Sequence, residues 1–443
     1  MTELDHRLDR LLEGRKEKNR FRSLKEYDIT SNSGLVDFSS NDYLSLTSSS
    51  SLRRNYLGKL ASTPSIFGST GSRLLSGCTP SHSSLEKRFE KFFNSPSALL
   101  FNSGWDANVS FFATVPQPND WVIYDELVHA SVHSGLRASR TAVERRLAFN
   151  HNDPKHLEKL LKRMQNTASS SNDSSTIFVA LESLYSMDGD FSPLPALLDV
   201  LEKYVPRKRL CVILDEAHST GVYGDKGRGI THALGEEGGF DEGDTRRRGK
   251  GRVDVRLMTF GKAVGCSGAV LLCSPTVRSF LINFARPLIF STALPHSTIT
   301  ALECVWDTLQ SEEGDQRRQS LMSVARYVHT LLDDLLSRTP PGILHLPPDP
   351  MIPFLTSPNL APKPGSPILG LLTPNPHALS AFLLDKGFIV RPVVPPTVPP
   401  GAERVRICLR AGMDKRVIEE LVAALAEWVD IKLAEDRSVR AKL

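Results

Sequence analysis

Long uncharged apolar runs are absent from this chain of 443 residues, and so is an excess of charge of one sign. A helix that crosses a membrane needs about 18 or more consecutive apolar residues, so the sequence predicts no membrane span. The formal net charge is +4, and basic residues cluster only at residues 15–22 and 246–252. Neither cluster alternates with aromatic residues, which favours solvated surface charge over a nucleic-acid interface.

Cysteine is scarce as well, with six residues and no Cys-x-x-Cys pair. This spacing offers no metal-ligand set, and thiols within apolar runs are typical of buried, reduced cysteines in an intracellular protein. We therefore expect neither a metal site nor disulfides. The first 28 residues place leucines on one helical face, but the acidic residues among them argue against a mitochondrial presequence; the leucines are Leu4, Leu8, Leu11 and Leu12.

A phosphate-binding loop of the G-x-x-x-x-G-K-[ST] type is also missing. The letters Asp-Glu-Ala-His at residues 215–218 occur in nucleic-acid helicases, but helicases need that loop as well. Each Gly-Lys pair here is followed by Leu, Gly or Ala, and the glycine-rich segment at residues 68–73 has no lysine. The helicase interpretation is therefore rejected.

What the sequence does contain is an alternation of strand-length apolar runs with helical stretches. This pattern predicts crossover units and a mostly parallel sheet covered by helices. Ligands of such sheets bind beyond the carboxyl ends of the strands, where Glu182, Asp215 and Lys262 fall. The predicted strands are residues 98–101, 121–124, 177–181, 211–214, 257–260 and 269–273.

The length is too great for one ordinary core, so we expect a large and a small domain. The predicted divisions are an N-terminal helix and arm at residues 1–45, a large domain at 46–310 and a small C-terminal domain at 311–443. The small domain begins with a long helix at residues 311–336, followed by a proline-rich stretch, a strand at 404–409 and an amphipathic helix. Polar insertions at residues 166–175 and 236–252 are expected to be mobile surface loops.

Two of these groups, a carboxylate and a lysine, suit one cofactor. A carboxylate at the end of one strand, Asp215, can keep a pyridine nitrogen protonated, so that the ring acts as an electron sink. A lysine at the end of another strand, Lys262, can bind an aldehyde covalently. Its uncharged Gly/Ala/Val surroundings predict a lowered pKa through desolvation. The pattern therefore predicts pyridoxal 5'-phosphate.

Six segments, in this order, resemble the α-oxoamine synthase family of fold-type I pyridoxal-phosphate enzymes. The resemblance runs from about residue 38 to residue 409, and the segments are residues 38–44, 68–74, 125–131, 186–190, 215–221 and 259–265. It implies a large domain with a mostly parallel seven-stranded sheet between helices and a small α+β domain. Within the family, Gly268-Ala269-Val270 and Pro395-Pro396-Thr397-Val398-Pro399 are similar to the 8-amino-7-oxononanoate synthases.

The resemblance assigns roles around the cofactor. Lys262 would hold it and later remove the substrate's α-proton, Asp215 would pair with the ring nitrogen, His218 would reach the phenolic oxygen and His129 would stack on the ring. The phosphate would lie at the N-terminus of a helix, which favours anions. The remaining cofactor residues implied are Ser103, Gly104, Trp105, Glu182, Ser186 and Thr259, with Ser291 and Thr292 of the partner subunit.

Substrate contacts follow from the same resemblance. Arg406 would bind the amino-acid carboxylate, a bidentate task that suits a guanidinium, and Asn41 would be a second contact. Arg404 shares its strand face because side chains alternate, but lies further from the site.

Arg22 and Thr397 match contacts to the acyl substrate. Where close relatives have an arginine before the Pro-Pro-Thr-Val-Pro segment, this chain has Val394, and Arg391 three residues earlier is the expected substitute.

The implied reaction condenses L-alanine with pimeloyl-CoA, or with pimeloyl carrier protein, to 8-amino-7-oxononanoate, CO₂ and a free thiol. The alternatives left open are 5-aminolevulinate synthase, 2-amino-3-ketobutyrate CoA ligase, serine palmitoyltransferase and a non-catalytic subunit of the same fold. A homodimer with shared sites is expected. The final Ala441-Lys442-Leu443 resembles a peroxisomal address read by an import receptor, so a peroxisomal location is expected, with the cytoplasm as alternative.

Overall fold

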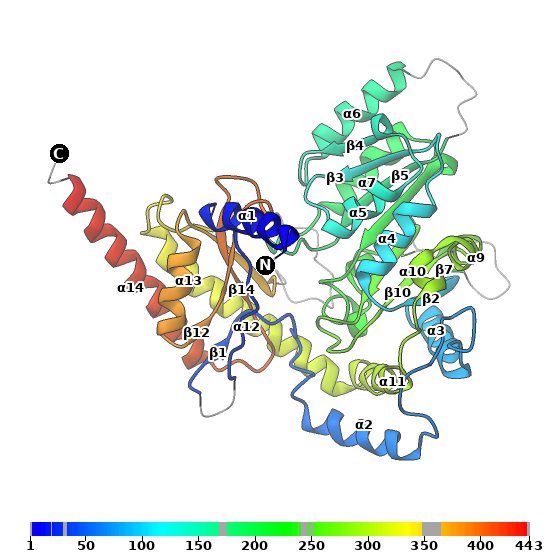
Figure 1. Ribbon diagram of the computed structural model, residues 1–443, viewed down its shortest axis with the longest axis horizontal. Helices are drawn as coiled ribbons and strands as arrows, with labels where there is room; N and C mark the ends of the chain where they lie inside the picture. The colour runs from blue at the N-terminus through cyan, green and yellow to red at the C-terminus, as the bar shows by residue number, and fades with distance from the viewer. Residues whose placement is uncertain are drawn as a thin grey trace.

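The computed structural model describes most of the chain in a two-lobed arrangement (Figure 1). The predicted address at residues 441–443 lies outside the described residues. The same holds for residues 168–174, 238, 241–246 and 249–250 of the two predicted insertions, and for residues 348–364 of the proline-rich stretch. The described residues are 2–18, 20–29, 33–167, 175–237, 239–240, 247–248, 251–347 and 365–440.

A seven-stranded sheet forms the centre of the larger lobe and confirms the predicted fold class. Strand β10 is antiparallel to both its neighbours, and the pairs on the other side of β9 are parallel. The edge strand β4 was not predicted, because its four residues contain Arg146 and only one buried side chain. In spatial order the strands are β2 (Ser97–Phe101), β10 (Ala269–Cys273), β9 (Val255–Thr259), β6 (Leu210–Asp215), β5 (Ile177–Glu182), β3 (Trp121–Asp125) and β4 (Arg146–Phe149).

Helices cover both faces of this sheet, because a central strand such as β5 carries apolar side chains on both faces. One buried cluster joins the sheet to α4 (Gly104–Thr114), α5 (Ala130–Ala138), α9 (Pro275–Phe284) and α10 (Arg286–Phe290). A second cluster joins it to α6 (Pro154–Thr167) and α7 (Leu194–Tyr204). Further helices are α3 (Pro80–Phe92), α8 (Ile230–Ala233) and α11 (His296–Gln310). Short 3₁₀ turns lie at Val143–Arg145, Arg207–Arg209 and Asp225–Gly227. Strands β7 (Gly239–Phe240) and β8 (Arg247–Arg248) pair in antiparallel fashion.

The smaller lobe contains a three-stranded antiparallel sheet in the order β11 (Ile368–Leu372), β14 (Arg404–Cys408), β13 (Arg391–Val393). Its helices are α12 (Glu312–Ser337), α13 (Pro376–Asp385) and α14 (Lys415–Arg440). The short strand β1 (Val36–Asp37) pairs in parallel with β12 (Phe388–Ile389), which ties the N-terminal arm to this lobe. The predicted helix at residues 311–336 and strand at 404–409 therefore agree with the structure to within one residue.

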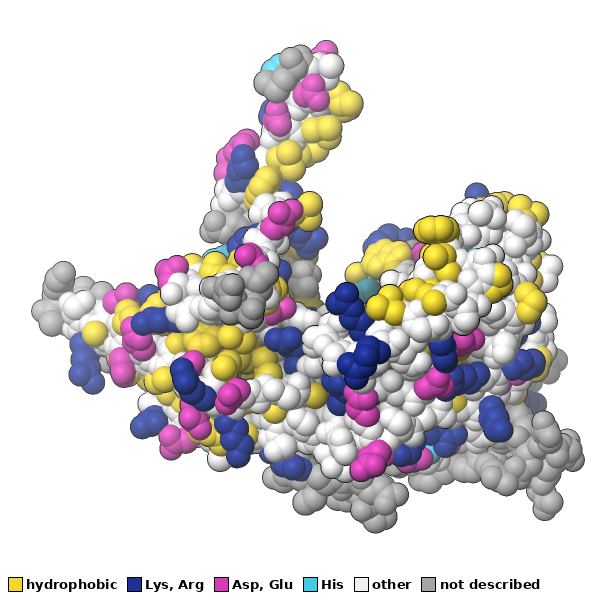
Figure 2. All heavy atoms as spheres, turned by 90° about the horizontal axis from the view of Figure 1, so that it is seen from below, with side chains coloured by type: hydrophobic (Ala, Val, Ile, Leu, Met, Phe, Trp, Pro, Cys, Tyr) yellow, Lys and Arg dark blue, Asp and Glu magenta, His cyan; other side chains and the backbone are white. Residues whose placement is uncertain are grey.

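The N-terminal helix α1 (Glu3–Glu17) stands away from the body of the molecule (Figure 2). A capping box between Thr2 and Asp5 starts the helix. Its four predicted leucines are 43% to 66% exposed, so this chain by itself does not bury the apolar face. Helix α2 (Ser50–Ser62) packs on α11 at the edge of the larger lobe.

Two expectations about side chains need correction. Cys78 is exposed and not buried, because it lies in a turn that leads into α3, whereas Cys273, Cys304 and Cys408 are buried. The second insertion is anchored at its ends, because the buried Arg252 forms an ion pair with the buried Glu236. None of the described helices is long and apolar enough to cross a membrane.

Candidate active site at the carboxyl ends of the strands

Lys262 lies in a tight turn after β9. The turn is closed by hydrogen bonds from the Phe260 N–H to Gly268 O and from the Cys266 N–H to Phe260 O. Burial lowers the pKa of Lys262 to about 8, and the carboxylates of Asp215 and Glu182 oppose this shift. A neutral amine is the nucleophilic form. The turn therefore presents a lysine that is ready for covalent chemistry near neutral pH.

Asp215 ends β6 and is fixed by two hydrogen bonds. Its Oδ2 accepts from Asn108 Nδ2 at 2.8 Å and its Oδ1 from the Ala217 N–H at 2.9 Å. Asn108 in turn contacts Ser131 Oγ at 3.0 Å. The sequence did not predict the support from Asn108, although this residue follows Gly104 by one helical turn, on the same face of α4.

His129 forms the N-cap of α5, and its ring lies edge-on to Trp105, with 5.9 Å between the ring centroids. Its Nδ1 is 2.7 Å from Ser131 Oγ, and its backbone N–H donates to Glu182 Oε1 at 2.5 Å. Desolvation lowers the pKa of His129, and the charge of Lys262 acts in the same direction while Asp215 opposes it. A neutral ring at physiological pH suits stacking on an aromatic cofactor.

Glu182 stands directly beside Asp215, because the two residues are paired in register across β5 and β6. Burial raises the pKa of Glu182 well above its usual value, and the charge of Asp215 adds to the effect. Burial therefore disfavours the charged form of Glu182. Glu182 thus positions His129 through its backbone.

The start of helix α4 provides the candidate phosphate site. Ser103 is the N-cap, and its Oγ accepts from the Asp106 N–H at 3.0 Å. The first N–H groups of a helix have no partner within the helix. A Cβ atom on Gly104 would lie 3.3 Å from Thr259 Oγ1, so a larger residue would crowd this cradle. Ser103, Gly104 and Thr259 therefore converge on one place, and the adjacent Trp105 is 46% exposed.

His218 connects the lysine to the other lobe. Its Nε2 is 2.8 Å from Lys262 Nζ and its Nδ1 is 2.7 Å from Tyr43 Oη, which is itself 3.1 Å from Asn41 Oδ1. Burial lowers the pKa of His218 well below its usual value, and the nearby cations add to this. A neutral ring accepts from Lys262 on Nε2 and donates from Nδ1 to Tyr43, which donates to Asn41. The sequence did not predict Tyr43, which lies two residues after Asn41.

Arg406 reaches the site from β14. Its Nη2 donates to Asn41 Oδ1 at 2.7 Å and its Nη1 to Ser186 O at 3.3 Å. None of the ion pairs between described residues includes Arg406, and both of these acceptors are neutral. The structure thus brings Arg406, Asn41 and Ser186 together around a guanidinium whose charge is available to a carboxylate.

The residues predicted for the acyl substrate lie further out. Arg22 is exposed on the N-terminal arm, and Thr397 is exposed in the turn after Pro396. The Arg391 guanidinium covers the Tyr27 ring at 5.4 Å from its centroid. Arg391 is also the register partner of Arg406 across β13 and β14, so both side chains start from the same face of the small sheet.

Ser291 and Thr292, predicted to act in the partner subunit, are exposed between α10 and α11. The backbone of Thr292 pairs with Ser72, and its carbonyl accepts from Asn102 Nδ2 at 2.8 Å. The two hydroxyl groups therefore lie on the surface of the large lobe.

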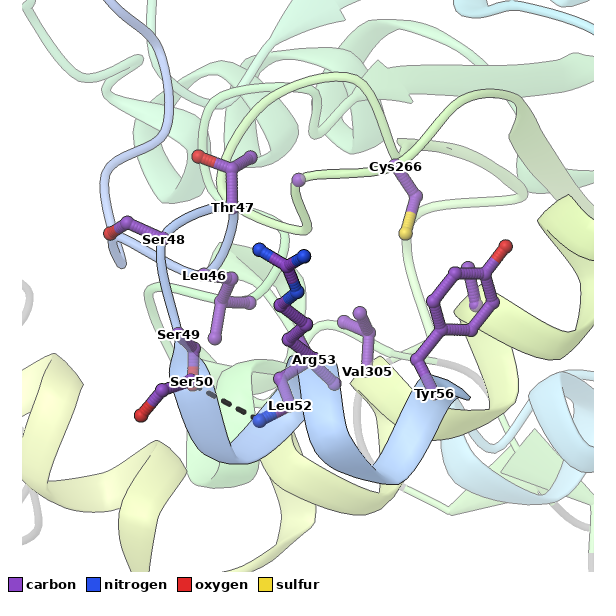
Figure 3. Close-up of a pocket in the computed structure, with 12 residues that line it drawn as sticks. Leu46, Thr47, Ser48, Ser49, Ser50, Leu52, Arg53, Tyr56, Cys266 and Val305 are labelled. Atoms are coloured by element: carbon purple, nitrogen blue, oxygen red, sulfur yellow. Dashed lines mark hydrogen bonds between the residues drawn. The ribbon is translucent and has the colours of Figure 1, made fainter. Parts of the chain in front are cut away.

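A cavity of about 400 Å³ lies behind the lysine turn, between α2 and α11. Figure 3 shows Arg53 and Cys266 pointing into it, with Tyr56 at one side. Its lining includes none of the predicted cofactor residues and meets the site only through the turn at Gly265 and Cys266. The candidate active site is therefore the cluster around Lys262 and not this cavity.

The donor set fits pyridoxal phosphate on chemical grounds. It combines an amine of lowered pKa, a hydrogen-bonded carboxylate, a neutral imidazole beside an indole and a helix N-terminus, all at one edge of one sheet. These are the groups that an aldehyde, a pyridine nitrogen, an aromatic ring and a phosphate require. Within the described residues, no cluster of three or more His, Cys, Asp or Glu side chains is arranged to hold a metal ion.

Comparison with known proteins agrees with this chemistry. Residues 33–425 match the family described as aminotransferase class I and II. The 8-amino-7-oxononanoate synthase of Emericella nidulans is 37% identical over 401 residues, which cover 90% of each chain. The aminoacyl transferase sphA of Aspergillus fumigatus is 32% identical over 89% of this chain and 81% of its own.

Among solved structures, the serine palmitoyltransferase of Sphingomonas wittichii superimposes with a TM-score of 0.76, covering 96% of this chain and 98% of its own at 23% identity. A likeness at this identity supports the fold. The family match and the relatives that cover most of the chain show that the chain belongs to the aminotransferase class I and II family of pyridoxal-phosphate enzymes and, within it, to the α-oxoamine synthases.

Proposed function

We propose that this protein condenses L-alanine with a pimeloyl thioester to give 8-amino-7-oxononanoate, CO₂ and a free thiol. The observation that carries the proposal is the half-buried guanidinium of Arg406, held by Asn41 and Ser186 with no carboxylate partner among the described residues, beside Lys262 and its lowered pKa. An amino-acid substrate needs both groups: the guanidinium binds its carboxylate, and the amine removes the proton from its α-carbon. The 37% identical relative named 8-amino-7-oxononanoate synthase supports the choice of substrates.

Each residue of the site has a task in this reaction. Pyridoxal phosphate supplies an electron sink that stabilises negative charge at the α-carbon. Lys262 holds the cofactor at rest, and its Nζ then takes the α-proton of alanine. His218 orients that amine through Nε2, and Asp215 keeps a proton on the pyridine nitrogen. Arg406 and Asn41 bind the alanine carboxylate, which leaves as CO₂ after the α-carbon has attacked the thioester and released the thiol.

The sink requires a fixed negative charge at Asp215. Its two hydrogen bonds hold the carboxylate in one orientation before the substrate arrives. Preorganised charge of this kind makes the largest contribution to the rate enhancement of many enzymes. Burial raises the pKa of Glu182, which disfavours its charged form and favours Asp215 as the partner of the ring nitrogen.

Recognition of the acyl chain rests on Arg391 in this proposal. A pimeloyl group ends in a carboxylate, and Arg391 starts beside Arg406 on the same face of the small sheet. Two like charges opposite one another on a sheet are unfavourable, so an anion near Arg391 relieves that repulsion. Arg22 and Thr397 lie on exposed segments and complete the proposed acyl contacts.

A second candidate is another α-oxoamine synthase with an uncharged acyl chain, as in serine palmitoyltransferase. Two observations favour it. Position 394, next to the Pro-Pro turn, is valine, and the Arg391 guanidinium already has an aromatic partner in Tyr27. An acyl chain without a distal carboxylate needs no cation there.

We also propose that the active unit is a homodimer. Phe67, Leu75 and Phe290 are 82%, 78% and 74% exposed, and the segment that carries the first two lies against Thr292 and His296. Large exposed apolar side chains on neighbouring segments are typical of a protein interface. A second copy docked there would bring the Ser291 and Thr292 hydroxyls to its neighbour's cofactor phosphate.

The test supplies the purified holoenzyme with alanine, glycine and serine in all combinations with pimeloyl-, succinyl-, acetyl- and palmitoyl-CoA, and measures CoA release. The proposal expects alanine with pimeloyl-CoA to give the highest kcat/KM. A maximum with serine and palmitoyl-CoA would establish the second candidate. Arg391→Gln should raise the KM for pimeloyl-CoA at least about tenfold, the effect of losing a charged hydrogen bond, and leave the KM for palmitoyl-CoA unchanged.

A further inference from the structure

The loop at residues 186–190 lies between the two lobes and is held from both sides. On the large-lobe side, Asp190 Oδ2 accepts from His151 Nε2 at 2.8 Å. On the small-lobe side, Gly189 lies against β11, where an added Cβ would fall 2.0 Å from Ile368 O, and its φ is +74°. No other residue type fits that approach. The loop is therefore pressed onto the small sheet at a fixed distance.

Strand β14 meets this loop with two arginines that lie two residues apart and so share one face. Arg404 forms an ion pair with Asp188, and its side chain and that of Asp188 are only 4% and 14% exposed. Its Nη1 also donates to Met187 O at 3.3 Å. The charge of Arg404 is thus already compensated by the loop.

Arg406 contacts the same loop in a different way. Its bond to Ser186 O at 3.3 Å is long and the acceptor is neutral. A neutral hydrogen bond contributes less than one between charged groups, so this contact alone does not hold the guanidinium in place. The position of Ser186 O in turn depends on where Asp188 fixes the loop.

We propose that the Arg404–Asp188 ion pair positions Arg406 for the amino-acid carboxylate. The inference rests on the proposed function in one respect, that the substrate is an amino acid. Asp188 fixes the loop on β14, the loop fixes Ser186 O, and Ser186 O with Asn41 Oδ1 sets the orientation of the Arg406 guanidinium. Arg404 and Asp188 are positioning residues, and neither contacts the substrate.

The test separates recognition of the substrate carboxylate from binding of the rest of the amino acid. Ethylamine is alanine without its carboxylate, so the ratio of the dissociation constants of ethylamine and L-alanine reports on the carboxylate site formed by Arg406 and Asn41. Both constants are measured on the holoenzyme from the change in cofactor absorbance. Asp188→Asn, Arg404→Gln and the double variant are compared with wild type. Asp334→Asn, which breaks the exposed Arg338–Asp334 pair, is the matched control.

We expect the ratio of the ethylamine to the L-alanine dissociation constant to fall about tenfold in each single variant and in the double variant. Ethylamine binding and the cofactor spectrum should stay unchanged. The kcat should remain within about threefold of wild type. The control should keep the wild-type ratio. Because a single variant leaves a buried charge unpaired and can fail to fold, the double variant, which removes both charges, is the decisive one.

Two results would overturn the inference: a double variant that keeps the wild-type ratio, or one in which both dissociation constants rise in parallel, as a purely structural role predicts. Failure of the proposed function is a separate outcome, since wild-type protein that binds alanine no better than ethylamine has no amino-acid carboxylate site at all.

Discussion

Asn108 Nδ2 lies 2.8 Å from Asp215 Oδ2, and it joins helix α4, which carries the candidate phosphate site, to the strand that carries the candidate ring-nitrogen carboxylate. One side chain therefore sets the distance between two parts of the cofactor site. Asn108→Ala should lower kcat about tenfold while the cofactor still binds, because the carboxylate loses one of its two hydrogen bonds. Steady-state kinetics and cofactor titration check this. Wild-type kcat in the variant would show that Asn108 has no part in orienting Asp215.

Replacing the carboxylate itself has a larger effect. Asp215→Asn should retain the fold and bind cofactor, but lose on the order of 10² to 10³ in kcat, because an amide does not keep the pyridine nitrogen protonated. The measurement is kcat with the cofactor saturating. A loss below about threefold would remove Asp215 from its assigned role.

The lowered pKa of Lys262 predicts how cofactor attachment depends on pH. Because burial lowers this pKa to about 8, the neutral fraction rises about fivefold from pH 7 to 8 and less than twofold from pH 8 to 9. The rate of cofactor attachment to the apoprotein, followed by visible absorbance in a stopped-flow instrument, should follow this curve. A rate that still climbs tenfold per pH unit above pH 9 would mean that the lysine has its ordinary pKa.

His151 makes a prediction about stability. Burial opposes its protonation, but hydrogen bonds and charges from Asp125 and Asp190 outweigh burial and raise its pKa to about 10. A pKa that is higher in the folded state stabilises the fold fully below the unfolded value of about 6.5, and this contribution is lost as pH rises through about 10. The stability difference between wild type and His151→Gln should therefore shrink steadily from pH 6.5 to pH 10.

The measurement is urea unfolding of the holoenzyme at several pH values. Burial raises the pKa of Asp190 despite the same contact, so pH values below 6.5 are left out of the comparison. A difference that stays constant or grows toward pH 10 would contradict an imidazolium at His151.

Much of this architecture follows from local sequence. The apolar runs that end in Glu182 and Asp215 predict buried parallel strands, and they form β5 and β6. Lys262 follows a third such run, so the sheet edge that gathers these residues was predictable. Strand β4 was missed because an edge strand needs little apolar surface.

The supporting contacts were not predictable in the same way. Asn108 and Tyr43 act across 107 and 175 positions of sequence, and nothing in their neighbours signals those partners. The exposure of Cys78 was also missed, because composition does not reveal which face of a turn meets solvent. The ion pair of Arg404 with Asp188 spans 216 positions and depends on how the two lobes meet.

The most direct test of the central claim follows the carboxyl carbon of alanine. Holoenzyme is incubated with L-alanine labelled with ¹³C in the carboxylate, with and without pimeloyl-CoA, and the labelled CO₂ is measured beside the same experiment on Lys262→Ala. We predict that wild-type enzyme forms one labelled CO₂ for each CoA released. Without pimeloyl-CoA, or with Lys262→Ala in place of wild type, neither product should form. Labelled CO₂ in the absence of pimeloyl-CoA, CoA release without labelled CO₂, or full activity of Lys262→Ala would contradict the account.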